Sequence, residues 1–257
     1  MKFENKLFVV TGGLSGLGAG TTKHLQALGG HVAVIDLTLP KKATKSTTLR
    51  CFKADVSNLE EVALAVQGIL QWAYEKSLDI HGVVCCAGFL GPAKILSKSN
   101  TPLALERFRK VVDISLVGTI DIIRQLLPRM ASQKPDADGQ RGVLITVASA
   151  AAFDGQEGQV AYSAAKGAIA SMTLPLARDL ASQGIRAVCI SPGLFDSNMT
   201  ANMPAKAQES VRKGLEFPAR GGRPDEFAAM VEHIVDNHML NGTVIRLDGA
   251  SRLPARL

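Results

Sequence analysis

A tyrosine and a lysine four positions apart form the pair in this chain best suited to proton-transfer chemistry. Tyr162 and Lys166 lie in an alanine-rich run, and on a helix this spacing puts the phenol and the ammonium on one face. A phenol titrates at a pH of about 10, and a nearby ammonium lowers that pKa. Tyr162 is therefore predicted to exchange a proton with an alcohol or carbonyl oxygen. An isolated pair of this kind is more often a contact on the surface of a helix. The prediction of a catalytic pair therefore depends on further residues elsewhere in the chain.

Small and polar residues follow three apolar runs that have the character of buried strands. Ser149 follows residues 142–148, Cys86 and Ala87 close a second run, and a Pro-Gly pair follows a third. In an open parallel sheet, the carboxyl ends of the strands face the ligand crevice. The Ser149 hydroxyl is therefore expected to polarise a substrate oxygen beside Tyr162.

A glycine-rich turn stands between an apolar run, residues 7–11, and a helical segment, residues 18–28. Glycines let the backbone turn tightly and approach a pyrophosphate, whose charge the N-terminus of a helix stabilises. Such a turn alone is a weak signal, but a strand before it and a helix after it favour a dinucleotide site. The turn covers residues 11–18 and contains four glycines, Gly12, Gly13, Gly16 and Gly18.

An aspartate ends the second predicted strand, residues 31–36. A carboxylate at Asp36 would accept hydrogen bonds from the adenosine ribose and repel a 2′-phosphate, which favours NAD over NADP. Two alternatives stay open: Asp36 is a solvated strand end, or the basic residues Lys41, Lys42 and Lys45 receive a 2′-phosphate.

Apolar runs alternate with helical segments along the chain. The apolar runs fall at 7–11, 31–36, 50–54, 82–86, 142–148, 185–191 and 244–247. The helical segments include 18–28, 57–75, 103–130 and 159–182. The helix over 57–75 is expected to begin at an N-cap, Ser57. This order predicts an α/β fold: a Rossmann-type, doubly wound, parallel seven-stranded sheet with helices on both faces, in a single domain over residues 1–257. Residues 193–226 break the rhythm and are expected to form a substrate-covering insertion.

Composition narrows the classes of partner. The 257 residues are 46% hydrophobic and 20% charged, which argues against global disorder. The net charge of +6 comes from scattered residues, so an anionic cofactor or substrate is expected rather than a nucleic acid. No metal site is expected, because the four cysteines lack zinc spacing. No membrane span is expected either, because no apolar stretch is long enough.

The order of these features resembles the short-chain dehydrogenase/reductase family over nearly the whole chain. The glycine turn, the spacing from Ser149 to the Tyr-x-x-x-Lys motif and the later Pro-Gly pair are the residues that carry the likeness. The resemblance implies hydride transfer between NAD(H) and a secondary alcohol or ketone, with Ser149, Tyr162 and Lys166 as catalytic residues. It also implies cofactor contacts from the turn residues Gly12, Ser15, Gly16, Leu17 and Gly18, and from Asp55, Val56, Cys86, Ala87, Tyr162, Lys166, Phe195 and Ser197.

One position departs from the family pattern. Where the family has asparagine in an Asn-x-x-Gly-Thr motif, holding a water that links the catalytic lysine to solvent, this chain has Ser115. A hydroxyl offers fewer hydrogen bonds than an amide. Either Ser115 holds the water less well, or the relay is rebuilt around it. Slower proton release with unchanged cofactor binding is expected, with Ser115 still among the catalytic residues.

Within the family, the chain resembles the type-2 3-hydroxyacyl-CoA dehydrogenases, also called type-10 17β-hydroxysteroid dehydrogenases. The similarity lies in residues 148–159, 173–180, 192–195, 240–242 and 246–250. It implies that the small-molecule substrate is a 3-hydroxyacyl-CoA, that the cofactor is NAD, and that the protein is a homotetramer in fatty acid metabolism. Substrate contacts are expected from Ser149, Tyr162 and Gln156, although Gln156 also suits a solvated loop.

Two other functions compete with this one. The first is a short-chain ketoreductase acting on a steroid or a secondary-metabolite ketone. The second is a non-catalytic binding protein on a Rossmann fold, a hypothesis that Ser115 favours and the retained Ser149, Tyr162 and Lys166 disfavour.

The last three residues resemble a targeting signal. Ala255-Arg256-Leu257 has the small–basic–leucine form of the peroxisomal address. A peroxisomal location is therefore expected if the source is eukaryotic, and a cytoplasmic one otherwise.

Overall fold

A single parallel sheet organises the molecule. The computed structural model describes residues 3–40, 46–196, 214–252 and 255. Within these residues, seven strands pair in the order β3-β2-β1-β4-β5-β6-β7, each parallel to its neighbours. The strands are β1 (Lys6–Thr11), β2 (His31–Asp36), β3 (Leu49–Lys53), β4 (Asp79–Cys85), β5 (Gly142–Val147), β6 (Ile185–Pro192) and β7 (Val244–Leu247). The predicted doubly wound sheet is confirmed, with strand bounds close to the predicted ones.

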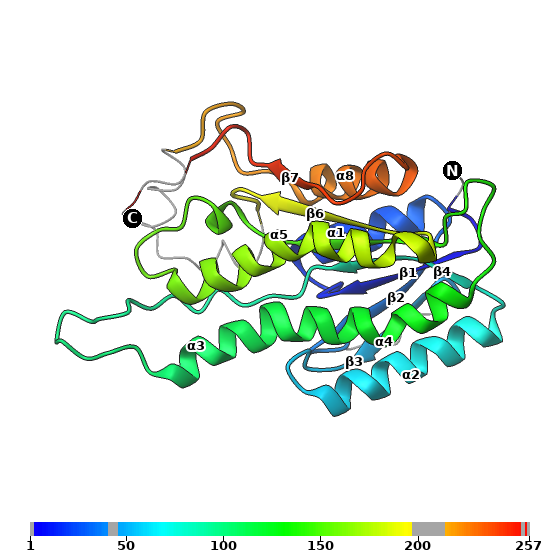
Figure 1. Cartoon of the computed structure of the whole chain (residues 1–257), viewed down its shortest axis with the longest axis horizontal. Coiled ribbons are helices and arrows are strands. Elements are labelled where there is room, and N and C mark those ends of the chain that lie inside the picture. The colour runs from blue at the N-terminus through cyan, green and yellow to red at the C-terminus, as the bar shows by residue number, and fades with distance from the viewer. Residues whose placement is uncertain (1–2, 41–45, 197–213, 253–254, 256–257) are drawn as a thin grey trace.

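Two layers of helices cover the sheet. Helices α1 (Gly16–Ala27) and α8 (Pro224–Asp236) lie on one face, and α2 (Leu59–Glu75) and α4 (Gly118–Ser132) lie on the other, with α5 (Val160–Leu180) packed into the same core as α2 and α4 (Figure 1). Because alternate side chains of a strand point to opposite faces, the strands feed two separate apolar cores. The strand order reverses between β1 and β4, so their carboxyl ends open a crevice there.

The start of α2 differs from the prediction. Asn58, not Ser57, is the N-cap: its side-chain oxygen accepts hydrogen bonds from the amides of Glu60 (3.1 Å) and Glu61 (3.2 Å). Ser57 instead donates its hydroxyl to the Asp55 carboxylate at 2.6 Å. The prediction was wrong because both residues are good caps, and only the path of the chain after β3 decides between them.

The long helical segment after β4 is also less regular than its sequence indicates. It begins as α3 (Leu105–Val112), loosens into a π-helical turn, Asp113–Val117, and continues as α4. Single π turns are frequent at functional sites, and this one contains Ser115. Helix α8 starts inside the predicted insertion, whose residues 197–213 lie outside the described part of the chain. In the described residues, no helix is long and apolar enough to span a membrane.

Candidate active site

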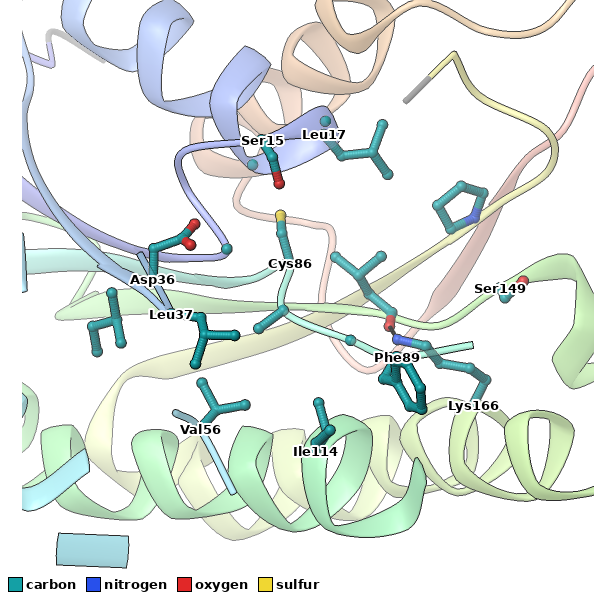
Figure 2. Close-up of a pocket in the computed structure, with 18 of the residues that line it drawn as sticks. Ser15, Leu17, Asp36, Leu37, Val56, Cys86, Phe89, Ile114, Ser149 and Lys166 are labelled. Carbon is teal, nitrogen blue, oxygen red and sulfur yellow. Dashed lines mark hydrogen bonds between the residues drawn. The ribbon is translucent and has the colours of Figure 1, made fainter. Parts of the chain in front are cut away.

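A cavity of about 510 Å³ opens at the carboxyl ends of the central strands. Figure 2 shows Asp36 at one end, Ser149 and Lys166 at the other, and Cys86 between them with its sulfur toward Ser15. The cavity brings together residues predicted from distant parts of the sequence: Gly12, Ser15, Gly16, Leu17, Gly18, Asp36, Asp55, Val56, Cys86, Ala87, Ser149, Tyr162, Lys166 and Phe195.

The glycine turn leaves the N-terminus of α1 open toward the cavity. Gly12 has φ of +62°, a conformation that favours glycine. A Cβ added to Gly18 would lie 2.2 Å from the Gly12 carbonyl oxygen, so no side chain fits there. Ser15 caps α1 without a side-chain hydrogen bond, and the first turn holds no acidic residue. The free amides of that turn are therefore suited to bind an anion.

The Asp36 carboxylate is held in place by two backbone amides. The Leu14 amide donates to Oδ2 at 3.1 Å, and the Thr38 amide donates to Oδ1 at 3.3 Å. The first of these bonds ties the end of β2 to the glycine turn. The carboxylate thus faces the cavity at a fixed place beside the anion-binding turn.

A second carboxylate lies across the same end of the cavity. Asp55 accepts hydrogen bonds from the Ser57 hydroxyl (2.6 Å) and amide (2.9 Å), which lower the pKa of Asp55. The amide of Asp55 donates to Glu61 at 2.8 Å. With an open helix N-terminus and two fixed carboxylates around one cavity, these residues fit the phosphates, ribose and base of a dinucleotide.

Lys166 lies at the opposite end and is nearly buried, with 4% of its surface exposed. Its Nζ donates to the Val147 carbonyl oxygen at 2.7 Å, at the end of β5. Burial lowers the pKa of Lys166 to about 8, while the neighbouring Cys189, Cys86 and Cys85 oppose the shift. The ammonium is thus charged at neutral pH but at a high desolvation cost.

Tyr162 lines the cavity beside Lys166. Burial raises the pKa of the Tyr162 phenol above 10.0, and a hydrogen bond with Ser149 opposes that shift only in part. The predicted lowering of this pKa counts the positive charge of a bound nicotinamide as well as that of the ammonium, so it stays a prediction for the protein with its cofactor. Lys166 Nζ donates to Val147 and lies 5.9 Å from the centre of the Tyr162 ring. The phenol is accordingly protonated at neutral pH.

Ser149 lies where β5 ends and a short 3₁₀ helix, Ala150–Ala152, begins. Its Oγ accepts a hydrogen bond from the Ala151 amide at 3.2 Å, which fixes the hydroxyl at the cavity wall. Because Ser149 also bonds to Tyr162, one oxygen atom of a substrate can meet both hydroxyls. This is the arrangement needed to polarise a carbonyl and move a proton to it.

Ser115 lies behind the cavity wall. It is fully buried, accepts a hydrogen bond from the Phe89 amide at 3.2 Å and donates to the Phe89 carbonyl at 3.5 Å. A Cβ added to Gly88 would lie 3.3 Å from Lys166 Nζ and 3.8 Å from Ser115 Oγ. The hydroxyl therefore stands near the lysine, although its place in a proton relay stays a prediction.

Two predicted contacts are not placed at the cavity. Gln156 is 6% exposed and does not line it, so its substrate contact stays a prediction. Ser197 lies outside the described residues. Conversely, sequence reasoning missed Phe89 and Lys110, which both line the cavity. Lys110 Nζ lies 5.5 Å from the centre of the Phe89 ring. This contact joins distant segments, so no local sequence pattern predicts it.

A family profile described as short chain dehydrogenase matches residues 6–208. The chain belongs to this family. The 3-hydroxyacyl-CoA dehydrogenase type-2 of Drosophila melanogaster is 42% identical over 255 residues, which cover 97% of this chain and 98% of that protein. The human protein of the same name is 42% identical over 250 residues, covering 95% and 94%.

A solved structure agrees with these relatives. The crystal structure of 3-hydroxyacyl-CoA dehydrogenase type-2 from Mycobacterium avium has a TM-score of 0.87 and 31% identity, and the match covers 99% of this chain and 98% of that one. The chain is therefore an oxidoreductase that uses a nicotinamide cofactor. Among the described residues, no group of three or more His, Cys, Asp or Glu side chains could hold a metal ion.

Proposed function

We propose that this protein interconverts 3-hydroxyacyl-CoA and 3-oxoacyl-CoA thioesters with NAD(H). The observation that carries the proposal is the near full-length similarity to proteins named 3-hydroxyacyl-CoA dehydrogenase type-2, together with Ser149, Tyr162 and Lys166 at one end of a dinucleotide-sized cavity. The chain's net charge of +6 also suits an anionic thioester.

The residues of the chain handle the proton and the orientation of the substrate. A bound nicotinamide cofactor supplies the hydride acceptor or donor. Ser149 donates a hydrogen bond to the substrate oxygen and holds it beside Tyr162. Tyr162 gives a proton to that oxygen in reduction and removes one in oxidation. The Lys166 ammonium, fixed by Val147, places positive charge behind the phenol and favours its ionised form.

The preference for NAD is supported by Asp36. Its carboxylate is fixed beside the glycine turn, where it would bond the ribose hydroxyls and repel a 2′-phosphate. We expect NADH to be used with at least tenfold higher kcat/KM than NADPH, a difference of about 1.4 kcal/mol. Equal use of both cofactors would contradict this part of the proposal.

A substrate panel tests the reaction. Purified protein is mixed with NADH and either acetoacetyl-CoA, ethyl acetoacetate or a steroid ketone, and NADH loss is followed by absorbance. We expect acetoacetyl-CoA to give the highest kcat/KM, and Tyr162→Phe to abolish turnover while NADH binding persists. Turnover of the steroid or the simple ketone, but not of acetoacetyl-CoA, would instead support a ketoreductase of another class.

Assembly and location extend the proposal. We further propose a homotetramer that acts in fatty acid metabolism, as the resemblance to type-2 3-hydroxyacyl-CoA dehydrogenases implies. Light scattering after size-exclusion chromatography would measure the oligomeric state directly. The tail Ala255-Arg256-Leu257 supports peroxisomal import in a eukaryotic source. In any other source we propose a cytoplasmic location. Because the Ala255 carbonyl accepts a hydrogen bond from the Glu157 amide at 3.0 Å, the import test should use Leu257→Asp, not a truncation. If the fluorescently tagged variant and wild type share one location, import by this tail is excluded.

A further inference from the structure

A compact charged cluster lies at the end of β7, outside the cavity. The Arg246 guanidinium donates through Nε to Asp248 at 2.6 Å and through Nη2 to Asp154 at 2.5 Å. The Arg246 and Asp154 side chains are 24% and 21% exposed, and that of Asp248 is 7% exposed. The two carboxylates raise the pKa of Arg246. One guanidinium therefore joins two aspartates that are 94 positions apart in the chain.

Each aspartate is linked to a different segment that lines the cavity. Asp248 packs against Gly193, where an added Cβ would lie 2.8 Å from the Asp248 Cβ, and Gly193 lines the cavity with Phe195. Asp154 stands in the loop that follows Ser149, and its amide donates to the Ala150 carbonyl at 2.9 Å. Arg246 thus connects the wall formed by the end of β6 with the wall that carries the Ser149 hydroxyl.

Further contacts fix the loop that follows Ser149, residues 150–159, between Arg246 and α5. The Arg246 guanidinium lies 5.3 Å from the centre of the Phe153 ring, and its Nη2 donates to the Ser251 carbonyl at 3.3 Å. On the inner side of the loop, a Cβ at Gly155 would lie only 2.4 Å from Ser163 Oγ, so the loop packs directly on α5 beside Tyr162. The loop is therefore clamped between α5 and Arg246.

We propose that Arg246 is a positioning residue that fixes the Ser149 loop relative to the β6 wall. It does not touch the substrate oxygen; it acts through Asp154 on Ser149, and so on the fit between Ser149 and Tyr162. Planar guanidinium groups suit this work because their donors form a rigid fork, which an ammonium lacks. The choice of substrate in the tests below rests on the proposed function. The coupling between Arg246 and the Ser149 loop does not depend on it.

Three variants separate this role from general stabilisation. Arg246→Met removes both ion pairs, and Asp154→Asn removes only the charge on the Ser149 loop. The matched control is Arg252→Met, because Arg252 contacts Asp248 at 3.4 Å on the outer side of the same cluster and its loss leaves the Arg246–Asp154 contact in place. For each protein, kcat and KM for acetoacetyl-CoA and the Kd for NADH are measured.

We expect Arg246→Met and Asp154→Asn to lower kcat roughly 10- to 100-fold, as small misplacements of reacting groups do, while the Kd for NADH stays within twofold. Arg246→Lys should recover only part of kcat, and Arg252→Met should retain wild-type kcat. The proposal is overturned if Asp154→Asn has wild-type kcat, or if Arg252→Met loses as much as Arg246→Met. Should Arg246→Met fail to fold, Asp154→Asn decides alone.

Hydrogen–deuterium exchange gives a readout that needs no substrate. We expect Asp154→Asn to speed exchange in a peptide spanning residues 150–159 and to leave the glycine turn, residues 12–18, unchanged. This outcome tests the positioning role even if acetoacetyl-CoA proves not to be a substrate. Unchanged exchange in both peptides would refute the clamp, whereas a lack of turnover by wild type would refute only the proposed substrate.

Discussion

Lys166 is predicted to cost the folded protein stability at neutral pH, and that cost can be measured. Burial lowers the pKa of Lys166 from 10.5 to about 8, a difference worth about 3.4 kcal/mol. The folded-state pKa is depressed, so the penalty is complete below pH 8 and disappears as the pH rises through 10.5. Between those limits the unfolded chain binds more protons, and stability therefore rises with pH.

The size of the effect follows from linkage. Between pH 7 and pH 9 the penalty falls by about 1.4 kcal/mol, equivalent to a gain of about 3 to 5 °C in Tm for a chain of this size. Lys166→Met removes this titration but also leaves the Val147 carbonyl without its donor, so the absolute stabilities of the two proteins are not compared. The quantity of interest is the difference between their pH dependences.

The assay is urea unfolding of wild type, Lys166→Met and an exposed control, Lys98→Met, at pH 7 and pH 9 without cofactor. Titrations of other groups, including Tyr162 and the buried cysteines, occur in all three proteins and largely cancel. We expect wild type and Lys98→Met to gain about 1.4 kcal/mol more than Lys166→Met over this range. If the free energy of unfolding changed with pH by the same amount in all three proteins, a buried ammonium with a lowered pKa at Lys166 would be refuted.

Three further predictions concern residues around the cavity. Asp36→Asn keeps an oxygen for the Leu14 amide but removes the charge, and should raise the NADPH-to-NADH ratio of kcat/KM by about tenfold; an unchanged ratio would rule out Asp36 as the selector. Ser115→Asn should raise turnover and leave the Kd for NADH unchanged, and turnover that does not change at any pH would show that proton release is not slowed by Ser115. Gly18→Ala should lower stability by about 1 to 3 kcal/mol and weaken NADH binding, because the added Cβ meets the Gly12 carbonyl; thermal melts and fluorescence titration would detect both effects, and a wild-type melt and Kd would contradict the close approach.

The sequence was informative where local rules decide the structure. Buried parallel strands are continuous apolar runs, so β2 was predicted with the bounds that the structure has. The bounds of β7 were also predicted, although all four of its residues are only half-buried. The glycine turn was recognisable because φ at Gly12 and the space at Gly18 leave no choice of residue. Tyr162 and Lys166 were predicted from their helical spacing together with Ser149, the glycine turn and Asp36 in the expected order.

The features that were missed depend on contacts between distant segments. The π-helical turn around Ser115 places its hydroxyl against Phe89, 26 positions away, and nothing in the local pattern distinguishes it from a regular helix. The Arg246 bridge depends on the register of β7 beside β6 and on the packing of Asp248 against Gly193. Such positions are fixed by the sheet as a whole, so composition and periodicity do not reveal them.

The raised pKa of Tyr162 also predicts different pH dependences for reduction and oxidation. In the protein alone the phenol is protonated across the neutral range, which is the state that donates a proton to a carbonyl. Reduction can therefore start from the resting ionisation of Tyr162, and its rate should vary little with pH below the pKa of Lys166, about 8. Oxidation needs the phenolate, and the Lys166 ammonium is already engaged by Val147. The oxidative rate should consequently rise with pH as a larger fraction of Tyr162 loses its proton. The rise should end at the pH where ionisation of the phenol no longer limits the rate.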